Sequence, residues 1–316
     1  MSATPWLRIV PALAAGLAMF ALAPILVRLA GPGADAVALT VVRTVGAMLV
    51  IVPIWWWHPA GRRSRRSQVE SALAEAGRRP AERPAEYQAG WWAGLLLALH
   101  FTLWTASLGY TTVASASVLV TSHPVLLIVI ESLVFGARFG AVTWAGVGIA
   151  FAGAVLLAAS ASGDGPGAPR PMLGNLLAFL AACLFVGYIL IGRRVAGRHS
   201  WLDWVTRVYS ATAVFTVLLL LGLWVLKGRT PEFSTGTIAA GLALAFGAQL
   251  MGHGALNYAV RYVAPTLLST LILAEPVFAT LLAIAVFEEV PSPAAAGAML
   301  VALFGIVLTW WSRREA

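Results

Sequence analysis

The chain has 316 residues, of which 60% are apolar and only 11% are charged. Soluble domains carry about 25% charged residues, so a soluble fold of this length could not cover so much apolar surface, and the bilayer is the expected solvent. The net charge of +8 does not indicate nucleic-acid binding, because the basic residues lie in short segments between long apolar runs. The single cysteine, Cys183, excludes a disulfide framework and a CxxC metal or redox motif.

Ten apolar runs are long enough to cross a hydrocarbon core of about 30 Å, which takes about 20 helical residues. The first five runs cover residues 9–30, 36–57, 91–110, 113–135 and 141–160. The other five cover residues 173–192, 204–226, 237–259, 264–287 and 293–311. The expected fold class is an all-α membrane protein with ten transmembrane helices, which is typical of a transporter and not of a soluble enzyme.

The basic residues predict the orientation of these spans. If the N-terminus lies inside, most arginines fall on cytoplasmic segments, above all in the loop 58–90, which carries an arginine cluster. Short cytoplasmic loops are enriched in Lys and Arg, so this bias predicts that both termini are cytoplasmic in a multi-pass protein of the cell membrane.

The two halves of the chain resemble each other. An offset of 152 residues places Tyr110 over Tyr262 and Pro124 over Pro276. Each half holds five spans, an odd number, so the second half must enter the membrane in the opposite orientation. The expected organisation is two inverted five-helix repeats, residues 9–160, with the cytoplasmic loop 58–90, and residues 173–312. Transporters of this design bind their solutes near the midplane, between the repeats.

Two stretches carry a resemblance to a known family. They are HFTLWTASLGYTTVASASVLVTSHPVLLIVIE, from His100 to Glu131, and QLMGHGALNYAVRYVAPTLLSTLILAEPVFATLLAIAVFEE, from Gln249 to Glu289. Each has a proline in the middle of a helix after a run of small residues, and the second ends on an acidic pair, which the first half lacks. The chain therefore resembles two tandem EamA domains of the drug/metabolite transporter superfamily. The resemblance implies ten helices, cytoplasmic termini and a transport role. That superfamily includes exporters of amino acids and other metabolites, and no motif here is specific for a substrate.

Polar side chains inside the spans are the candidate transport residues, because such groups are costly in a membrane. In the run 237–259, Gln249, His253 and Asn257 are spaced to share one helix face. This stripe predicts either the lining of a wet cavity or a seam of hydrogen bonds between helices.

A second stripe lies in the run 91–110, where His100, Trp104 and Ser107 share a face. An aromatic ring beside polar groups suits an amphipathic organic solute. The alternative is that Trp104 packs against neighbouring helices or lipid.

Two helix-breaking prolines follow titratable residues, since His123 precedes Pro124 and Glu275 precedes Pro276. Under the repeat the two titratable positions are equivalent, so they should lie at the same depth. If Glu275 titrates, it is the candidate for proton coupling, and otherwise it is a structural hydrogen-bonding group. Arg43, well inside the second span, could attract a carboxylate or pair with an acid.

Two further patterns concern packing. Glycines in the runs 141–160 and 293–311 are expected to let these helices pack closely and to join the halves. Arg207, nearer the cytoplasmic end of its span, is expected to snorkel toward the interface.

The leading hypothesis is a secondary transporter that exports a small metabolite, such as an amino acid or another amphipathic solute, by alternating access. A flippase for a lipid-linked intermediate is the alternative, and it would need a cavity open sideways to lipid. An intramembrane enzyme is disfavoured, because the sequence has no HExxH or comparable motif. We expect no metal or other cofactor. The expected partners are a small-molecule solute and the lipid bilayer, with no nucleic acid, and a homodimer stays open.

Overall fold

The structure is a computed structural model that describes residues 6–31, 34–59, 61, 85–111, 113–161, 169–196, 198–228, 231–275, 277–278, 282 and 292–312. These residues form helices and contain no strand. Pro276, the acidic pair 288–289 and most of the loop 58–90 lie outside the described residues.

The helices follow the expected spans. The first half contributes α1 (Trp6–Leu29), α2 (Ala36–Trp57), α4 (Ala85–Ser107), α5 (Val113–Val120), α6 (His123–Leu133) and α7 (Ala141–Ala161). The second half contributes α8 (Pro171–Val195), α9 (Trp201–Lys227), α10 (Thr235–Leu244), the π-helix η1 (Ala245–His253), α11 (Gly254–Ala259), α12 (Pro265–Ile272) and α14 (Pro293–Trp311).

Within the described ranges, six helical segments are long and apolar enough to cross a membrane. They are Ile9–Val27, Ala36–Trp57, Ala116–Leu133, Pro171–Val195, Trp201–Leu226 and Thr235–Ala259. Two shorter apolar helices cover Ala141–Leu156 and Ala296–Trp311. Large apolar side chains such as Val225 of α9 and Leu300 of α14 remain exposed on the outside of the bundle, where lipid would cover them. The structure therefore supports a helical membrane protein with several spans, and the count of ten stays a prediction.

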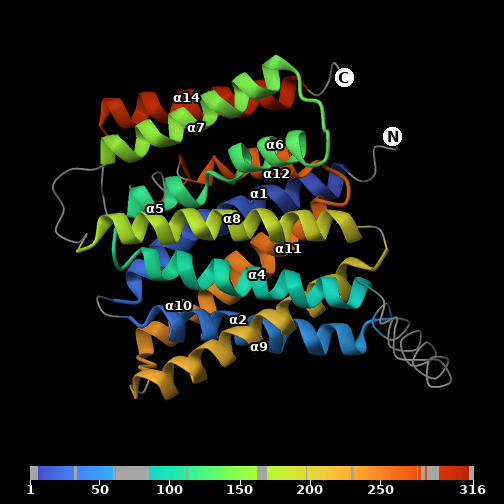
Figure 1. The fold of residues 1–316 in the computed structure, drawn as a ribbon, viewed down its shortest axis with the longest axis vertical. Helices are drawn as coiled ribbons and strands as arrows, with labels where there is room; N and C mark the ends of the chain where they lie inside the picture. Colours follow the sequence, from blue (N-terminus) through green and yellow to red (C-terminus); the bar gives the residue numbers. More distant parts are fainter. Residues whose placement is uncertain are drawn as a thin grey trace.

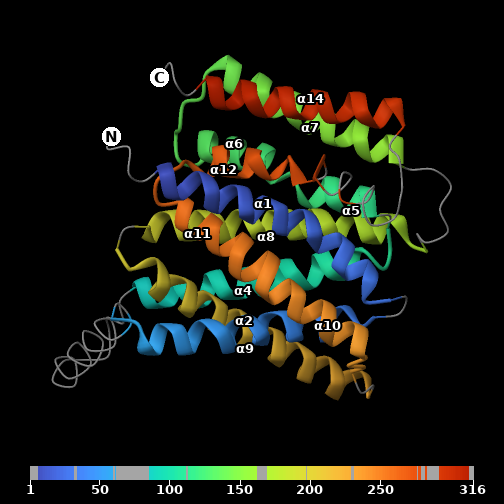
Figure 2. The ribbon, with the colours of Figure 1, turned by 180° about the vertical axis from the view of Figure 1, so that it is seen from behind.

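The main helix contacts join the first half of the chain to the second. Helix α1 packs against η1, and α8 packs against α4. Helix α2 packs against α9, α6 against α12, and α7 against α14. Figures 1 and 2 show α7 and α14 along one edge of the molecule and α2 and α9 along the opposite edge. The core, and the candidate site with it, lies between these edges.

Glycines bring α7 and α14 into close contact. A Cβ atom on Gly153 would lie 2.3 Å from the backbone nitrogen of Ala302, and one on Gly305 would lie 2.2 Å from that of Ala150. Only glycine allows two backbones to approach so closely, as expected from the sequence. The same expectation was wrong for Gly148 and Gly297, because a Cβ atom at either position would meet nothing within 4 Å.

The fourth expected span is broken in its middle. Helix α5 ends at Val120, α6 begins at His123, and Pro124 lies in the first turn of α6. The Thr121 hydroxyl donates to the carbonyl of Ser117 at 2.7 Å, and the Ser122 hydroxyl donates to the carbonyl of Leu119 at 2.7 Å. Hydroxyl side chains thus supply partners to the backbone where the helix stops, which is what makes a break tolerable inside a membrane.

Candidate functional site

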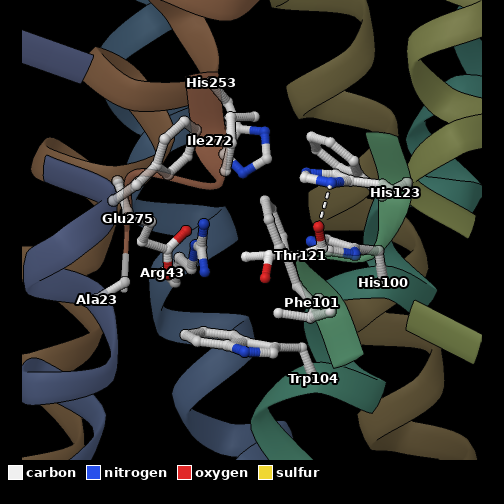
Figure 3. A pocket seen from close by; sticks show the side chains of 14 residues that line it. Ala23, Arg43, His100, Phe101, Trp104, Thr121, His123, His253, Ile272 and Glu275 are labelled. Carbon is white, nitrogen blue, oxygen red and sulfur yellow. Dashed lines mark hydrogen bonds between the residues drawn. The ribbon is translucent and has the colours of Figure 1, made fainter. Parts of the chain in front are cut away.

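A small cavity of about 50 Å³ lies where the broken helix meets α1, α2, α4, α8, η1 and the end of α12. Many of the residues that the sequence singled out line it, and Figure 3 shows their side chains converging. These are Arg43, His100, Trp104, His123, His253 and Glu275. Side chains from both halves of the chain therefore meet in one place, which we call the central cavity.

Aromatic rings form much of the wall of the central cavity. The His253 ring packs edge-on against Phe20 and Phe101, with ring centroids 4.9 Å apart in both cases. The rings of His100 and His123 lie 5.0 and 4.7 Å from Phe185. These separations are typical of favourable aromatic pairs, so the phenylalanines hold the three imidazoles in fixed orientations.

Backbone carbonyls set the tautomers of two histidines. Nδ1 of His100 donates to the carbonyl of Ala181 at 2.8 Å, and Nδ1 of His123 donates to the carbonyl of Thr121 at 3.1 Å (Figure 3). A carbonyl only accepts, so Nδ1 carries the hydrogen in both rings and Nε2 of the neutral ring is left as an acceptor.

The central cavity also holds two groups of opposite charge. The Arg43 side chain is only 2% exposed, and its Cζ lies 3.6 Å from the centroid of the Phe101 ring. This is a cation–π contact in a site shielded from water. Figure 3 shows the carboxyl group of Glu275 pointing toward the Arg43 guanidinium, and the two groups interact electrostatically.

Three buried polar atoms at the central cavity have no hydrogen-bond partner among the described residues. They are Nε of Arg43, Nε1 of Trp104 and Nδ1 of His253. Buried polar atoms in proteins nearly always form hydrogen bonds, so each of these atoms has the capacity to bond to a bound solute. In the described part of the chain, no three His, Cys, Asp or Glu side chains are placed to hold a metal ion.

Asn257 lies outside the central cavity, in a seam of hydrogen bonds. Its Oδ1 accepts from Nε1 of Trp204 at 3.0 Å, and its Nδ2 donates to the carbonyl of His253 at 2.8 Å and to the hydroxyl of Tyr188. The stripe of polar residues in this span is therefore divided, with His253 in the cavity and Asn257 between helices.

Ser107 and Gln249 are not among the cavity-lining residues either. The Ser107 hydroxyl donates to the carbonyl of Trp104 at 2.7 Å. The Gln249 side chain is fully buried, and its amide atoms have no partner among the described residues. Positions eight apart in a helix, such as Gln249 and Asn257, lie about 12 Å apart along its axis, so a long stripe cannot all reach one small cavity.

Sequence reasoning missed the aromatic wall and Thr121. An apolar ring in a membrane span is equally compatible with lipid contact, so Phe20 and Phe185 carried no signal. Phe101 follows His100 and Thr121 stands just before the His–Pro break, and proximity to these candidates was the signal available.

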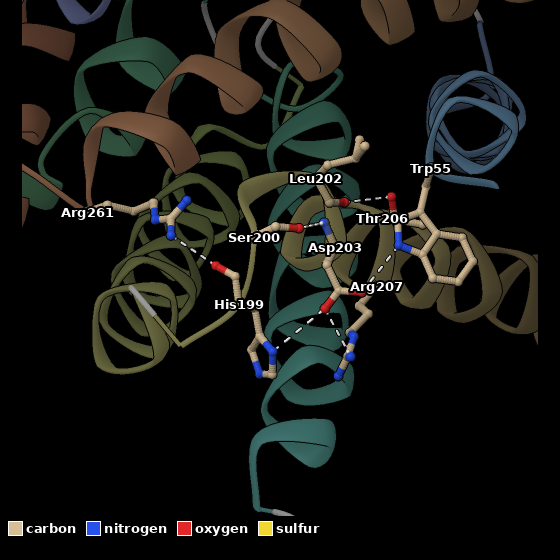
Figure 4. A network of polar contacts seen from close by, with 8 residues as sticks. All are labelled: Trp55, His199, Ser200, Leu202, Asp203, Thr206, Arg207 and Arg261. Atoms are coloured by element: carbon tan, nitrogen blue, oxygen red, sulfur yellow. Dashed lines mark hydrogen bonds and ion pairs between the residues drawn. The ribbon is translucent and has the colours of Figure 1, made fainter. Parts of the chain in front are cut away.

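A second buried charge lies near the end of the bundle where α2 ends and α9 begins (Figure 4). The Asp203 side chain is only 3% exposed, and its carboxylate accepts from Arg207 at 3.0 Å and from Nε1 of Trp55 at 3.2 Å. His199 lies 3.7 Å from the same carboxylate, and the Ser200 hydroxyl accepts from the Asp203 amide at 3.1 Å. We call these five residues the Asp203 network. Arg207 is held by this ion pair and is 17% exposed, and its expected reach toward the membrane interface stays a prediction.

Comparison with known proteins gives two findings. The model of the EamA-like transporter family matches residues 7–159 and 172–311, in two tandem segments. A solved structure described only as the crystal structure of a protein aligns with a TM-score of 0.72 at 20% sequence identity, and the alignment covers 98% of each chain. At this identity the likeness shows a shared fold. No curated protein matches the sequence.

Proposed function

Because the chain belongs to the EamA-like transporter family, we propose that it is a secondary transporter that moves a small amphipathic solute across the cell membrane. The observation that carries the proposal is the central cavity. There a guanidinium, a carboxyl group and three imidazoles meet aromatic rings, and side chains come from both halves of the chain. Charged groups are rare inside membranes and usually mark the path of a solute.

We infer that the chain has ten spans in two inverted five-helix repeats, residues 9–160 and 173–312. The reciprocal helix contacts support this arrangement. Helix α1, the first span of its half, contacts η1 in the third span of the other half, and α8 contacts α4 in the same way. A two-fold axis in the membrane plane would produce both contacts and would place the site on the axis.

The size of the central cavity supports a mechanism of alternating access. A volume of about 50 Å³ has room for a few water molecules, whereas sites for organic ligands usually measure about 300–1,000 Å³. We infer that the structure represents a form too narrow for an organic solute, and that a solute would enter when the halves separate. The break between α5 and α6 and the π-helix η1 both adjoin the cavity, and π-helical turns are frequent at functional sites.

The proposed direction is export, with both chain termini in the cytoplasm. The start of α1, the end of α14 and the ends of α2 and α4 that flank residues 62–84 lie at the same end of the bundle (Figure 1). The chain segments at this end are rich in arginine, which favours a cytoplasmic location for this end of the bundle.

A reporter that is active only outside the cytoplasm should be inactive when it is fused to the C-terminus. Strong activity would contradict the orientation.

The transport role is tested by loading cells with a panel of labelled metabolites and measuring their loss. Cells that express the protein should lose at least one of these solutes faster than cells carrying the empty vector. Arg43→Gln should abolish the difference at equal membrane expression, while Gly148→Ala, whose Cβ atom meets open space, should retain it. Equal loss of every solute with and without the protein would contradict export.

A further inference from the structure

We propose that the solute of the central cavity is a small monocarboxylate, that its carboxylate binds Arg43, and that Glu275 carries a proton while the solute is bound. This inference rests on the proposed function, since it names the chemical class of solute for the same cavity. It follows from the hydrogen-bonding capacity, the shape and the charge of the site.

The hydrogen-bonding capacity of the central cavity points to an acceptor. Arg43 Nε and Trp104 Nε1 can only donate, and both lack a partner among the described residues. Nδ1 of His253 is unpartnered as well, and it donates in one of its two tautomers. Trp104 is 6% exposed and His253 is 3% exposed, so water outside the protein does not reach them freely. A carboxylate brings two oxygens that accept from several donors, and its bonds to a guanidinium are among the strongest hydrogen bonds in proteins.

The walls of the central cavity select the rest of the solute. The rings of Phe20, Phe101, Phe185 and Trp104 surround the donors, so a planar apolar body would pack well behind the carboxylate. The cavity offers less to an ammonium group on the solute, because Glu275 is the sole carboxyl group among the lining residues and Arg43 already attracts it.

The charge of the central cavity requires the proton. Ionised Arg43 and Glu275 balance each other, so an added anion would leave the site with a net negative charge, which is costly in a medium of low dielectric constant. If Glu275 is protonated, the anion and Arg43 form a neutral pair. The other titratable groups that line the site are His100 of α4, His123 of α6 and His253 of η1. The solute and the ionised form of Glu275 thus compete for one guanidinium.

This competition couples solute to protons with a defined sign. As the pH rises and Glu275 loses its proton, Glu275 occupies Arg43 and the affinity for the anion falls. As the pH falls, the affinity rises until Glu275 is fully protonated. One linked proton gives a slope of about tenfold in affinity per pH unit on the alkaline side.

The test measures binding to the purified full-length protein by calorimetry, with probes that share one ring but differ in charge. The probes are benzoate, benzenesulfonate, phenylalanine and benzylamine. We expect benzoate to bind at least about tenfold more tightly than phenylalanine or benzylamine at the same pH. Benzenesulfonate stays ionised throughout, so a loss of its affinity with rising pH reports a protein group and not the probe.

Variants assign the two roles. At alkaline pH, Glu275→Gln should bind benzenesulfonate at least about tenfold more tightly than the wild type, and its affinity should no longer fall as the pH rises. Arg43→Gln should lose both anions, and Arg43→Lys should restore part of the binding, which separates a missing charge from a misfolded protein.

The outcomes distinguish this inference from the proposed function. Preferential binding of phenylalanine or benzylamine that depends on the cavity residues would overturn the anion class and leave the cavity as the transport site. An unchanged pH profile in Glu275→Gln would overturn the role of the proton. If no probe bound to the folded protein, the inference would be wrong. If, in addition, cells with and without the protein lost every labelled solute equally, the proposed function would be wrong as well.

Discussion

The central cavity and the Asp203 network both place charged side chains beside histidine and tryptophan rings inside the helical bundle. In the Asp203 network, the carboxylate accepts from an arginine and an indole N–H and lies close to a histidine. The backbone amide of Asp203 donates to the hydroxyl of Ser200. In the central cavity, Arg43, Trp104 and His253 each keep a polar atom without a partner among the described residues. The two regions are similar in composition and differ in how the charged group is bonded, because the Asp203 carboxylate has several hydrogen-bond donors and the Arg43 guanidinium keeps one nitrogen without a partner among the described residues.

This difference separates a structural cluster from a binding site. A buried charge that is fully hydrogen-bonded stabilises one arrangement of the chain, and removing one member leaves the others uncompensated. A buried charge that lacks partners costs stability in the free protein, and a guest recovers that cost on binding. Changes in the Asp203 network should therefore alter stability, and changes in the central cavity should alter binding.

The largest expected effect is that of Arg43→Gln on binding. Loss of one member of a buried charge pair typically costs about 2–5 kcal/mol, so we expect the affinity for benzoate to fall at least roughly 30-fold. The melting temperature in detergent should change little, because loss of the contacts with Phe101 and Glu275 is offset by removal of a buried charge that keeps one unpartnered nitrogen in the described structure. A large drop in melting temperature with unchanged affinity would place Arg43 with the structural cluster.

Asp203→Asn should have the opposite profile. The amide removes the negative charge that pairs with Arg207 and weakens the bond from Trp55, so the free energy of unfolding should fall by about 1–3 kcal/mol. Benzoate affinity should stay within twofold of the wild type. Thermal unfolding and calorimetry on the same sample measure the stability and the benzoate affinity. A loss of affinity with unchanged stability would contradict a purely structural role for the Asp203 network.

Glycine substitutions give a purely steric reference for a change in stability. Gly153→Ala places a Cβ atom against the backbone of Ala302, and such overpacking typically costs about 1–3 kcal/mol. Gly148→Ala lies on the same helix with open space around its Cβ atom and is the matched control. Gly153→Ala should lower the melting temperature without affecting benzoate affinity. Equal melting temperatures for the two variants would contradict the close packing of α7 and α14.

The smallest expected effects are those of replacing Trp104 or Trp55 by phenylalanine, and the two substitutions should differ in whether binding or stability is lost. Replacement by phenylalanine keeps an aromatic ring and removes one N–H group, worth about 0.5–1.5 kcal/mol. In Trp104→Phe this loss should appear as roughly three- to tenfold weaker benzoate binding. In Trp55→Phe it should appear as lower stability with normal binding, because the indole N–H donates to Asp203. Weaker binding in Trp55→Phe and lower stability in Trp104→Phe would contradict the distinction between the structural network and the binding site.

The sequence was sufficient to predict the membrane class and the charged and histidine residues of the cavity. Composition predicted apolar helices, and Pro124 predicted a change of course near His123, where α5 gives way to α6. Helical spacing predicted which face of a span is polar. It could not predict depth along the axis, and therefore His253 lies in the central cavity while Asn257 lies in a seam.

Other features depend on contacts between distant segments. Nothing in the local sequence indicates that Trp55 of α2 donates to Asp203 of α9, or that Phe20 and Phe185 meet around His253. The π-helix η1 also has no local signal that we recognised. These features follow from packing of the two halves against each other, so only a three-dimensional structure reveals them.

The central claim, that the central cavity opens alternately to the two sides of the membrane, is tested most directly by thiol accessibility. Cys183 is exposed, so the background is Cys183→Ala. Single cysteines replace Ala248, which lines the cavity, and Ala302, which is buried between α14 and α7. An impermeant thiol reagent is then added to right-side-out and to inside-out vesicles. We predict that the cysteine at 248 reacts from both sides and that the one at 302 reacts from neither. Reaction of the cysteine at 248 from one side only, or from neither, would contradict the account.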